Sequence, residues 1–324
     1  MKKFKLVEAR LDDEWDKFID SSKNGTIFSN SFFLKHTNYK IFYCYQNSEI
    51  KAAIALTQKD GKIILDDLVI YNGIIYANPQ KNQNHSQTLS EQFQIQEFIA
   101  NELTNLFNHI EMRLHPSIVD IRAFLWVNYG TNLPKYQHNI RYTSYIDISD
   151  FRKVEKLEDI SIYNKASTSR RQQIRYALKK GYETKAEEIS KLDKFIELYI
   201  MTMKRQNLEI DSYWLNKMKK LSYDLISKNK AKLYGSYDEN GELGSMAIFA
   251  WDNKRAYYLY GANHPDKRKG HTGTDILWKA FYDLSSMGID EVDLEGVNSP
   301  YRGWFKLSFG GDIIPYYYLK YEGD

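Results

Sequence analysis

The sequence has little of several residue types, and each shortage excludes a class of protein. A single cysteine, Cys44, occurs among 324 residues, so neither an internal disulfide nor a cysteine-based zinc site can form. The strand-like run around it predicts a buried structural thiol. The seven histidines are scattered without the paired spacing of metal ligands, and we therefore expect no metal.

Long apolar runs and a strong net charge are also missing. No stretch approaches the length of a membrane span, and the acidic run Asp12-Asp13-Glu14 follows Met1-Lys2-Lys3 without the apolar segment of a signal peptide. We therefore expect a cytoplasmic protein with no integral membrane segment. The formal net charge of +3 is too small to indicate nucleic acid or an anionic membrane, so an anionic partner has to be held by a local cluster.

Aromatic residues are abundant. The chain has 26 Tyr, 16 Phe and 6 Trp, and tyrosine suits both strands and polar clefts because it joins an apolar ring to a hydroxyl group. Two interpretations stay open at this point, a sheet-rich protein and a cleft lined by phenol rings. The length fits two domains of average size.

Strand and helix patterns alternate along both halves of the chain. The first half predicts strands between Phe32 and Ala77, a polar loop from Pro79 to Ser90 and a helix from Glu91 to Asn108. The second half predicts a helix with a capping box at Ser169 and Gln172 and an end at Gly181, a hairpin turn at 238–241, a strand at 255–260, a helix from 272 to 287, and strands at 291–294 and 313–321. The pattern predicts a mixed α/β fold in two parts.

A glycine-containing basic loop precedes the helix predicted to begin near Thr272. Its expected anion contacts are Lys267, Arg268, Gly270, His271, Gly273 and Thr274. Glycines let backbone N–H groups approach an anion closely, and the helix start adds the positive end of its dipole. The loop is thus interpreted as a pyrophosphate site, with a solvated basic turn as the alternative.

Two further candidates follow in the sequence. Asp293 and Glu295 are expected on the same face of a strand end, where Glu295 either takes a proton from an attacking ammonium or pairs with a nearby cation. Lys306 lies between aromatic residues. It either stabilises the oxyanion of an acyl transfer or lies on the surface with its stem against apolar groups.

These stretches together resemble the FemABX-like acyltransferases, which are tandem GNAT-like proteins. The resemblance spans most of the chain and is carried by Tyr258-Leu-Tyr-Gly261, Leu277-Trp278, Asp293, Phe305-Lys306-Leu-Ser-Phe309-Gly310, the basic run from Ser169 to Gly181 and the early run from Ile27 to Phe33. It implies two GNAT-like domains, each a mixed sheet flanked by helices, with a cleft between them. The expected ranges are 1–148 with the tail strand 312–324, and 149–311 for the catalytic domain.

The resemblance also implies roles for individual residues. Phe305 and Lys306 would flank the acyl carbonyl, and Tyr260 and Asn298 would contact the substrate. Arg171 and Arg175 share one stripe of the basic helix with Lys179. They form either a solvated face or a phosphate contact for the substrate.

The expected activity is transfer of an acyl group, expected to be acetyl, from acyl-CoA to an amine. The expected acceptor is an amino sugar or a nucleotide-linked sugar of a surface glycan. The basic glycine loop favours CoA, while Glu209 and Asp211 replace the basic phosphate contact expected of a cell-wall enzyme. Two alternatives stay open: a tRNA-dependent aminoacyl ligase for peptidoglycan precursors, and a non-catalytic protein that binds nucleic acid or glycan.

Overall fold

The computed structural model describes residues 4–323, and the side chains of all of these except Arg268 and Lys269. Residues 1–3 and 324, which the expected domain ranges include, lie outside the described part. The chain divides into two compact units. Unit N runs to Arg141 and continues from Pro315, and unit C runs from Tyr142 to Ile314. Both boundaries fall inside strands, β7 (Gln137–Asp147) and β13 (Asp312–Glu322).

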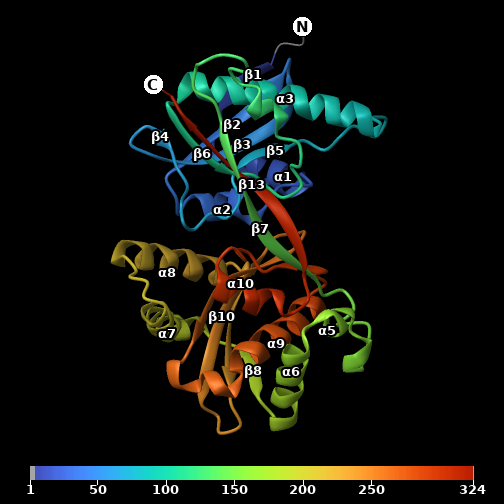
Figure 1. Cartoon of the computed structure of the whole chain (residues 1–324), viewed down its shortest axis with the longest axis vertical. Coiled ribbons are helices and arrows are strands. Elements are labelled where there is room, and N and C mark those ends of the chain that lie inside the picture. Colours follow the sequence, from blue (N-terminus) through green and yellow to red (C-terminus); the bar gives the residue numbers. More distant parts are fainter. Residues whose placement is uncertain (1–3, 324) are drawn as a thin grey trace. The chain divides into compact units, whose positions relative to one another are not determined.

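Unit N is a sheet with helices packed against it. Its sheet has the order β1-β2-β3-β4-β6-β13, and β5 pairs with β3. Its other strands are β1 (Phe4–Glu8), β2 (Tyr39–Gln46), β3 (Glu49–Lys59), β4 (Lys62–Ile63), β5 (Gly73–Tyr76) and β6 (His109–Arg113). Its helices are α1 (Asp13–Ser21), α2 (Ser31–Leu34), α3 (His85–Leu106) and α4 (Arg122–Leu125), with a 3₁₀ turn at Ile27–Ser29. Figure 1 shows α3 alongside this sheet, packed against β1 and β6.

The thiol of Cys44 is buried in β2, as its sequence context predicts. It belongs to the apolar core that α3 closes, together with Ile54 and Ile99. Burial raises the pKa of this thiol to about 12, so the thiolate does not form near neutral pH. The residue therefore acts as a small core side chain.

Helix α3 begins six residues before the predicted start at Glu91, so the prediction of a polar loop as far as Ser90 is wrong. The side chain of Asn84 accepts a hydrogen bond from the backbone N–H of Gln87, and the side chain of Gln87 accepts one from the backbone N–H of Asn84. This capping box satisfies two backbone donors at the helix start. The helix can therefore begin within a polar stretch.

The strands of unit C follow in the same sheet path, in the order β7-β12-β11-β10-β9-β8. The strands after β7 are β8 (Glu183–Ala186), β9 (Ala231–Tyr237), β10 (Leu243–Trp251), β11 (Ala256–Asn263) and β12 (Glu291–Asp293). The helices are α5 (Ser161–Lys165), α6 (Thr168–Lys180), α7 (Leu192–Arg205), α8 (Ser212–Ser227), α9 (Thr272–Ser286) and α10 (Pro300–Leu307), with 3₁₀ turns at Leu157–Asp159, Ile189–Lys191 and Pro265–Gly270. Figure 1 shows α6 and α9 on one side of these strands and α7 and α8 on the other. The predicted mixed α/β fold is confirmed.

The core of unit C is rich in aromatic rings. Trp278 and Phe281 of α9 pack with Phe249 of β10 and with Phe309, which follows α10. Through these ring contacts, the segment after α10 packs against α9, and α9 packs against the sheet. The aromatic surplus of the sequence thus serves the core here, and other rings line the pocket described below.

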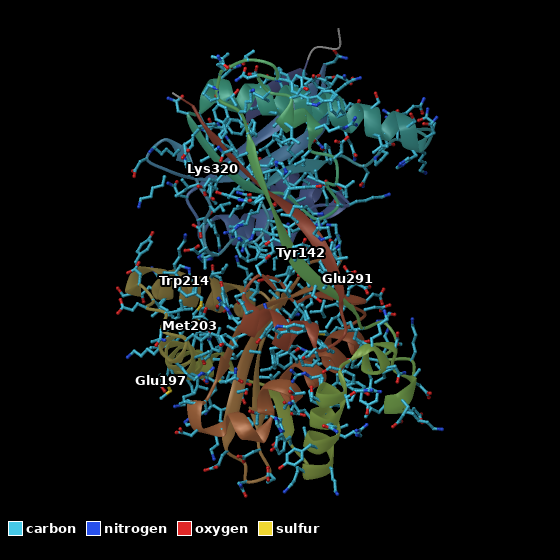
Figure 2. All side chains as sticks on the ribbon, in the orientation of Figure 1. Tyr142, Glu197, Met203, Trp214, Glu291 and Lys320 are labelled. Carbon is cyan, nitrogen blue, oxygen red and sulfur yellow. The ribbon has the colours of Figure 1, made fainter. Side chains whose placement is uncertain are left out.

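Strands β11 and β12 pair over a short distance only. Their parallel register joins Ala256 to Val292 and Tyr257 to Asp293, and β12 ends at Asp293. Beyond Tyr257, β11 therefore has no strand partner on that side among residues 4–323. On its other side, β12 pairs with β7 from Glu291, labelled in Figure 2, onward.

Candidate functional site

A pocket of about 1340 Å³ opens in unit C where β11 and β12 separate. It is lined by Tyr258–Gly261 of β11, by residues of α6 and α7, by the first turn of α9 and by α10. Met203 of α7, labelled in Figure 2, is one of them. Sites for a single small ligand measure roughly 300–1,000 Å³, so the volume suits two substrates bound side by side.

The lining of this pocket carries more positive than negative charge. Its cations are Arg170, Arg205, Arg302 and Lys306, and its one carboxylate among the described residues is Asp266. Walls of one sign concentrate ligands of the opposite sign. The pocket therefore favours an anionic ligand, although the whole chain is close to neutral.

Lys306 reaches the pocket from α10. Its Nζ lies 3.4 Å from the backbone carbonyl oxygen of Glu295 and 5.3 Å from the centre of the Tyr258 ring. Burial lowers the pKa of this amine to about 8, and the nearby carboxylates of Glu295 and Asp293 partly offset that effect. A cation beside the ligand space whose charge is lost just above neutral pH is typical of functional sites.

Glu295 lies behind Lys306 and is only 5% exposed. Its backbone has a positive φ of 53°, so the strand alternation predicted for Asp293 and Glu295 ends at Asp293. The Oδ1 atom of Asp293 accepts a hydrogen bond of 2.7 Å from the backbone N–H of Glu295 and another from the hydroxyl of Thr143. Burial, and then the charge of Asp293, raise the pKa of Glu295. Glu295 does not line the pocket, whereas Lys306, which contacts its backbone carbonyl, does.

The first turn of α9 faces the pocket through Gly273 and Thr274, and His271 immediately before it also lines the pocket. His271 has a left-handed backbone with a φ of 62°, and no side chain of the described residues caps this helix. The backbone N–H groups of Thr274 and Asp275 already donate to the carbonyl oxygen of His271. Among the described residues, those of Thr272 and Gly273 are left open to an anion. The predicted pyrophosphate loop thus ends at the pocket.

Other residues of that loop lie elsewhere. Lys267 is paired with Glu242 and Asp238. A Cβ at Gly270 would lie 3.3 Å from the hydroxyl of Tyr182, and Gly270 does not belong to the lining. The side chain of Arg268 lies outside the described part of the structure.

The structure separates the expected substrate contacts. Tyr260 lines the pocket, whereas Asn298 exchanges two hydrogen bonds of 2.8 Å with the backbone of Tyr142. Arg175 donates a hydrogen bond of 2.8 Å to the hydroxyl of Tyr163. Neither Arg175 nor the half-buried Arg171 lines the pocket.

Arg170 is the pocket residue that sequence reasoning missed. It does not share the helix stripe of Arg171, Arg175 and Lys179. Its guanidinium contacts the rings of both Phe305 and Phe309, 4.5 Å from each centre, and these two rings meet edge to face with their centres 5.6 Å apart. Phe305 lines the pocket beside it. The only signal in the sequence was its position next to Arg171.

Within residues 4–323, no helix combines the length and the apolar character that crossing a membrane requires. In the same part of the chain, no cluster of three or more His, Cys, Asp or Glu side chains is arranged to hold a metal ion.

Comparison with known proteins places this geometry in context. Residues 168–303 match the family model described as acetyltransferase (GNAT) domain. No curated protein matches the sequence significantly. Among solved structures, FemX is similar at 14% identity and a TM-score of 0.67, covering 97% of this chain and 96% of its own.

Two other solved structures are similar over nearly the full length. One is L-PGS from Bacillus licheniformis, at 12% identity and a TM-score of 0.53, covering 98% of this chain and 93% of its own. The other is a tandem GNAT protein from the clavulanic acid biosynthesis pathway, at 10% identity and a TM-score of 0.52, covering 99% and 98%. At these identities the likeness establishes the fold, and the matched GNAT domain contains most of the pocket described above.

Proposed function

We propose that this chain, whose residues 168–303 match an acetyltransferase (GNAT) domain and whose fold is similar to FemX and to a tandem GNAT protein, moves an acyl group from acyl-CoA to an amine. The acyl group we propose is acetyl. The acceptor we propose is an amino sugar or a nucleotide-linked sugar of a surface glycan. The observation that carries the proposal is one pocket in which the uncapped first turn of α9 and the amine of Lys306 face the same space.

Each side of the pocket has a role in this reaction. The N–H groups of the first turn of α9 bind a phosphate of CoA, which directs the thioester toward α10. The acceptor amine attacks the thioester carbonyl, and the carbonyl oxygen gains negative charge as the tetrahedral intermediate forms. The protonated amine of Lys306 stabilises that charge, and Phe305 packs beside the acyl group. The intermediate then collapses, the C–S bond breaks and CoA leaves as the thiol, with the proton that the acceptor amine loses.

Glu295 acts on the reaction through Lys306. It does not line the pocket, so it has no direct path to the acceptor amine. Its carboxylate raises the pKa of Lys306 against the effect of burial. We assign Glu295 to keeping Lys306 protonated, and the proton of the acceptor amine passes through solvent or substrate to the departing sulfur of CoA.

The donor is tested first by thermal unfolding of the purified protein with acetyl-CoA. Ligand at about a hundred times its dissociation constant is expected to raise the free energy of unfolding by roughly 2.7 kcal/mol. CoA should give a similar shift, and adenosine alone a much smaller one, because it lacks the phosphates. No shift with millimolar acetyl-CoA would reject the CoA donor.

The pH dependence of kcat tests the role of Lys306. Its pKa is lowered to about 8, so the cation is present below that pH and is lost as the pH rises through it. At pH values where the acceptor amine is already deprotonated, we expect kcat to fall above pH 8, because Lys306 loses its charge there. Lys306→Arg is expected to remove this falling limb, because arginine stays charged.

The Glu295→Gln variant gives an independent check of the same limb. Removing the carboxylate removes a contribution that raises the pKa of Lys306, so the falling limb should move to lower pH. If the fall in kcat stays at the same pH in both Lys306→Arg and Glu295→Gln, the fall is due to the titration of another group.

A second donor is supported by one observation. The fold likeness to FemX extends over both units, with a TM-score of 0.67, and the FemABX-like resemblance includes enzymes that use aminoacyl-tRNA. Transfer of a labelled amino acid from charged tRNA to a muropeptide, with no CoA-dependent product, would favour this donor over acyl-CoA.

A further inference from the structure

We propose that Arg170 is a further donor-binding residue, whose guanidinium takes a phosphate group of the CoA donor beside the first turn of α9. The inference rests on the proposed function and deepens it. It adds a side-chain cation from α6 to a site that was expected to consist of the loop between β11 and α9.

Arg170 is held in a fixed position at the pocket wall. It is 6% exposed, and its guanidinium packs against both phenyl rings of the adjacent Phe305–Phe309 pair. Its Nε donates a hydrogen bond of 2.9 Å to the hydroxyl of Ser308. These contacts hold the plane of the group against α10.

The second nitrogen of the group is tied to α9. Nη1 donates to Oε1 of Gln173 at 2.6 Å and to the hydroxyl of Thr274. That hydroxyl in turn donates to Gln173 at 2.7 Å. Since Thr274 lies in the first turn of α9 and lines the pocket, the cation is positioned beside the open N–H groups of that turn.

The third guanidinium nitrogen of Arg170, Nη2, has at least one N–H that is not engaged in a short hydrogen bond. A guanidinium has five N–H groups, and one on Nε and two on Nη1 are satisfied. Nη2 has two, and among the described residues its contact is a long one of 3.5 Å to the carbonyl oxygen of Phe305. At least one N–H of Nη2 is therefore available to a ligand in the pocket that Arg170 lines.

The charge of Arg170 also lacks compensation. No carboxylate of the described residues forms a salt bridge with it, and burial alone lowers its pKa to about 10. A buried charge without a partner is costly. A bound anion would offset that cost, so the apo site is arranged for one.

Phosphate is the anion that fits these donors. It can accept at once from the planar guanidinium and from backbone N–H groups. The neighbouring His271 does not compete as a cation, because burial and the charge of Arg170 lower its pKa. The pantetheine arm of CoA separates its phosphates from the thioester sulfur, so a phosphate held at Arg170 leaves that arm to run along the pocket toward Lys306.

The experiment measures binding of CoA and of inorganic pyrophosphate by calorimetry. Arg170→Met removes the charge and keeps a straight apolar chain against the two rings, while Arg170→Lys keeps the charge without the planar fork. We expect CoA to bind at least tenfold more weakly to Arg170→Met and at least threefold more weakly to Arg170→Lys. Lys180→Gln, which removes an exposed cation from the same helix, is expected to bind CoA as the wild type does.

The outcomes separate this inference from the proposed function. Wild-type binding of CoA with unchanged affinity in both variants would overturn the role of Arg170 and leave the CoA donor intact. If Arg170→Met does not fold, unchanged CoA affinity in Arg170→Lys alone would likewise overturn the role of Arg170 and leave the CoA donor intact. Pyrophosphate binding that depends on Arg170, without any CoA binding, would support the phosphate site and reject the donor. Binding of neither ligand to the wild type would reject both.

Discussion

Replacing Lys306 with alanine is expected to lower kcat by roughly 10²–10³-fold, the usual loss when one donor to a developing oxyanion is removed. The amine is one of two cations that α10 places at the pocket wall, and it directly follows Phe305. Its interaction strengthens as negative charge forms on the carbonyl oxygen, so the loss should appear in kcat more than in KM. Steady-state kinetics, with the acylated product measured by mass spectrometry, give both constants.

Two variants make the result interpretable. Lys306→Arg keeps a cation at the site and should retain more activity than Lys306→Ala. Lys194→Ala removes an exposed lysine of α7 that pairs with Glu197, labelled in Figure 2, and should leave kcat unchanged because such surface pairs contribute little. A Lys306→Ala protein that turns over at the wild-type rate would show that the oxyanion is stabilised elsewhere.

Gly310→Ala is expected to destabilise unit C by about 3 kcal/mol or more. Gly310 has a φ of +88°, and a Cβ there would lie 2.6 Å from the backbone carbonyl carbon of Lys165 and 2.8 Å from the backbone nitrogen of Ala166. These neighbours are main-chain atoms, so relief requires a shift of α5 or of the turn after α10. Urea unfolding followed by circular dichroism measures the loss.

Gly288→Ala is the matched control. Gly288 also has a positive φ, +90°, but a Cβ there has open space around it. It should cost about 1–2 kcal/mol from backbone strain alone. Equal losses in the two variants would mean that the close approach at Gly310 has no energetic effect.

The Gly310 geometry also gives a physical reason for the last residue of the Phe-Lys-x-x-Phe-Gly element. The chain must turn sharply after α10 so that Phe309 can enter the core against Phe281. The N–H of Gly310 closes that turn on the carbonyl of Leu307 at 2.9 Å. Because Phe309 also packs on Arg170, the glycine affects both the fold and the pocket.

Elements that depend on local signals could be predicted from the sequence. The turn at 238–241 joins β9 to β10 as expected, with Gly241 at a φ of +74°. Gly181 ends α6 in the left-handed conformation. The start of that helix was predicted wrongly, because the side chain of Ser167, and not Ser169, accepts from the backbone N–H of Arg170. Three serine or threonine residues in a row made the local signal ambiguous.

The site could be predicted only in part. The loop before α9 and the Phe305-Lys306 pair have sequence patterns that point to their chemistry, and both border the pocket. Arg170 has no such pattern, since its burial depends on two rings more than 130 residues further along the chain. The regular spacing of Arg171, Arg175 and Lys179 indicated a helix face, but spacing does not tell which neighbouring residue enters a pocket. The position of Glu295 next to Lys306 likewise depends on the left-handed backbone of Glu295. The alternation of side chains along a strand does not predict such a backbone.

The buried state of Cys44 affects how the proposed reaction can be followed. Acyl transfer from a thioester releases a free sulfhydryl group on CoA, which coloured disulfide reagents detect continuously. Cys44 is fully shielded in the core of unit N, and burial raises its pKa to about 12, so the folded enzyme contributes no background to such a reading. A slow rise in colour without any acceptor would then report either hydrolysis of the donor or unfolding of unit N, and a blank without donor distinguishes the two.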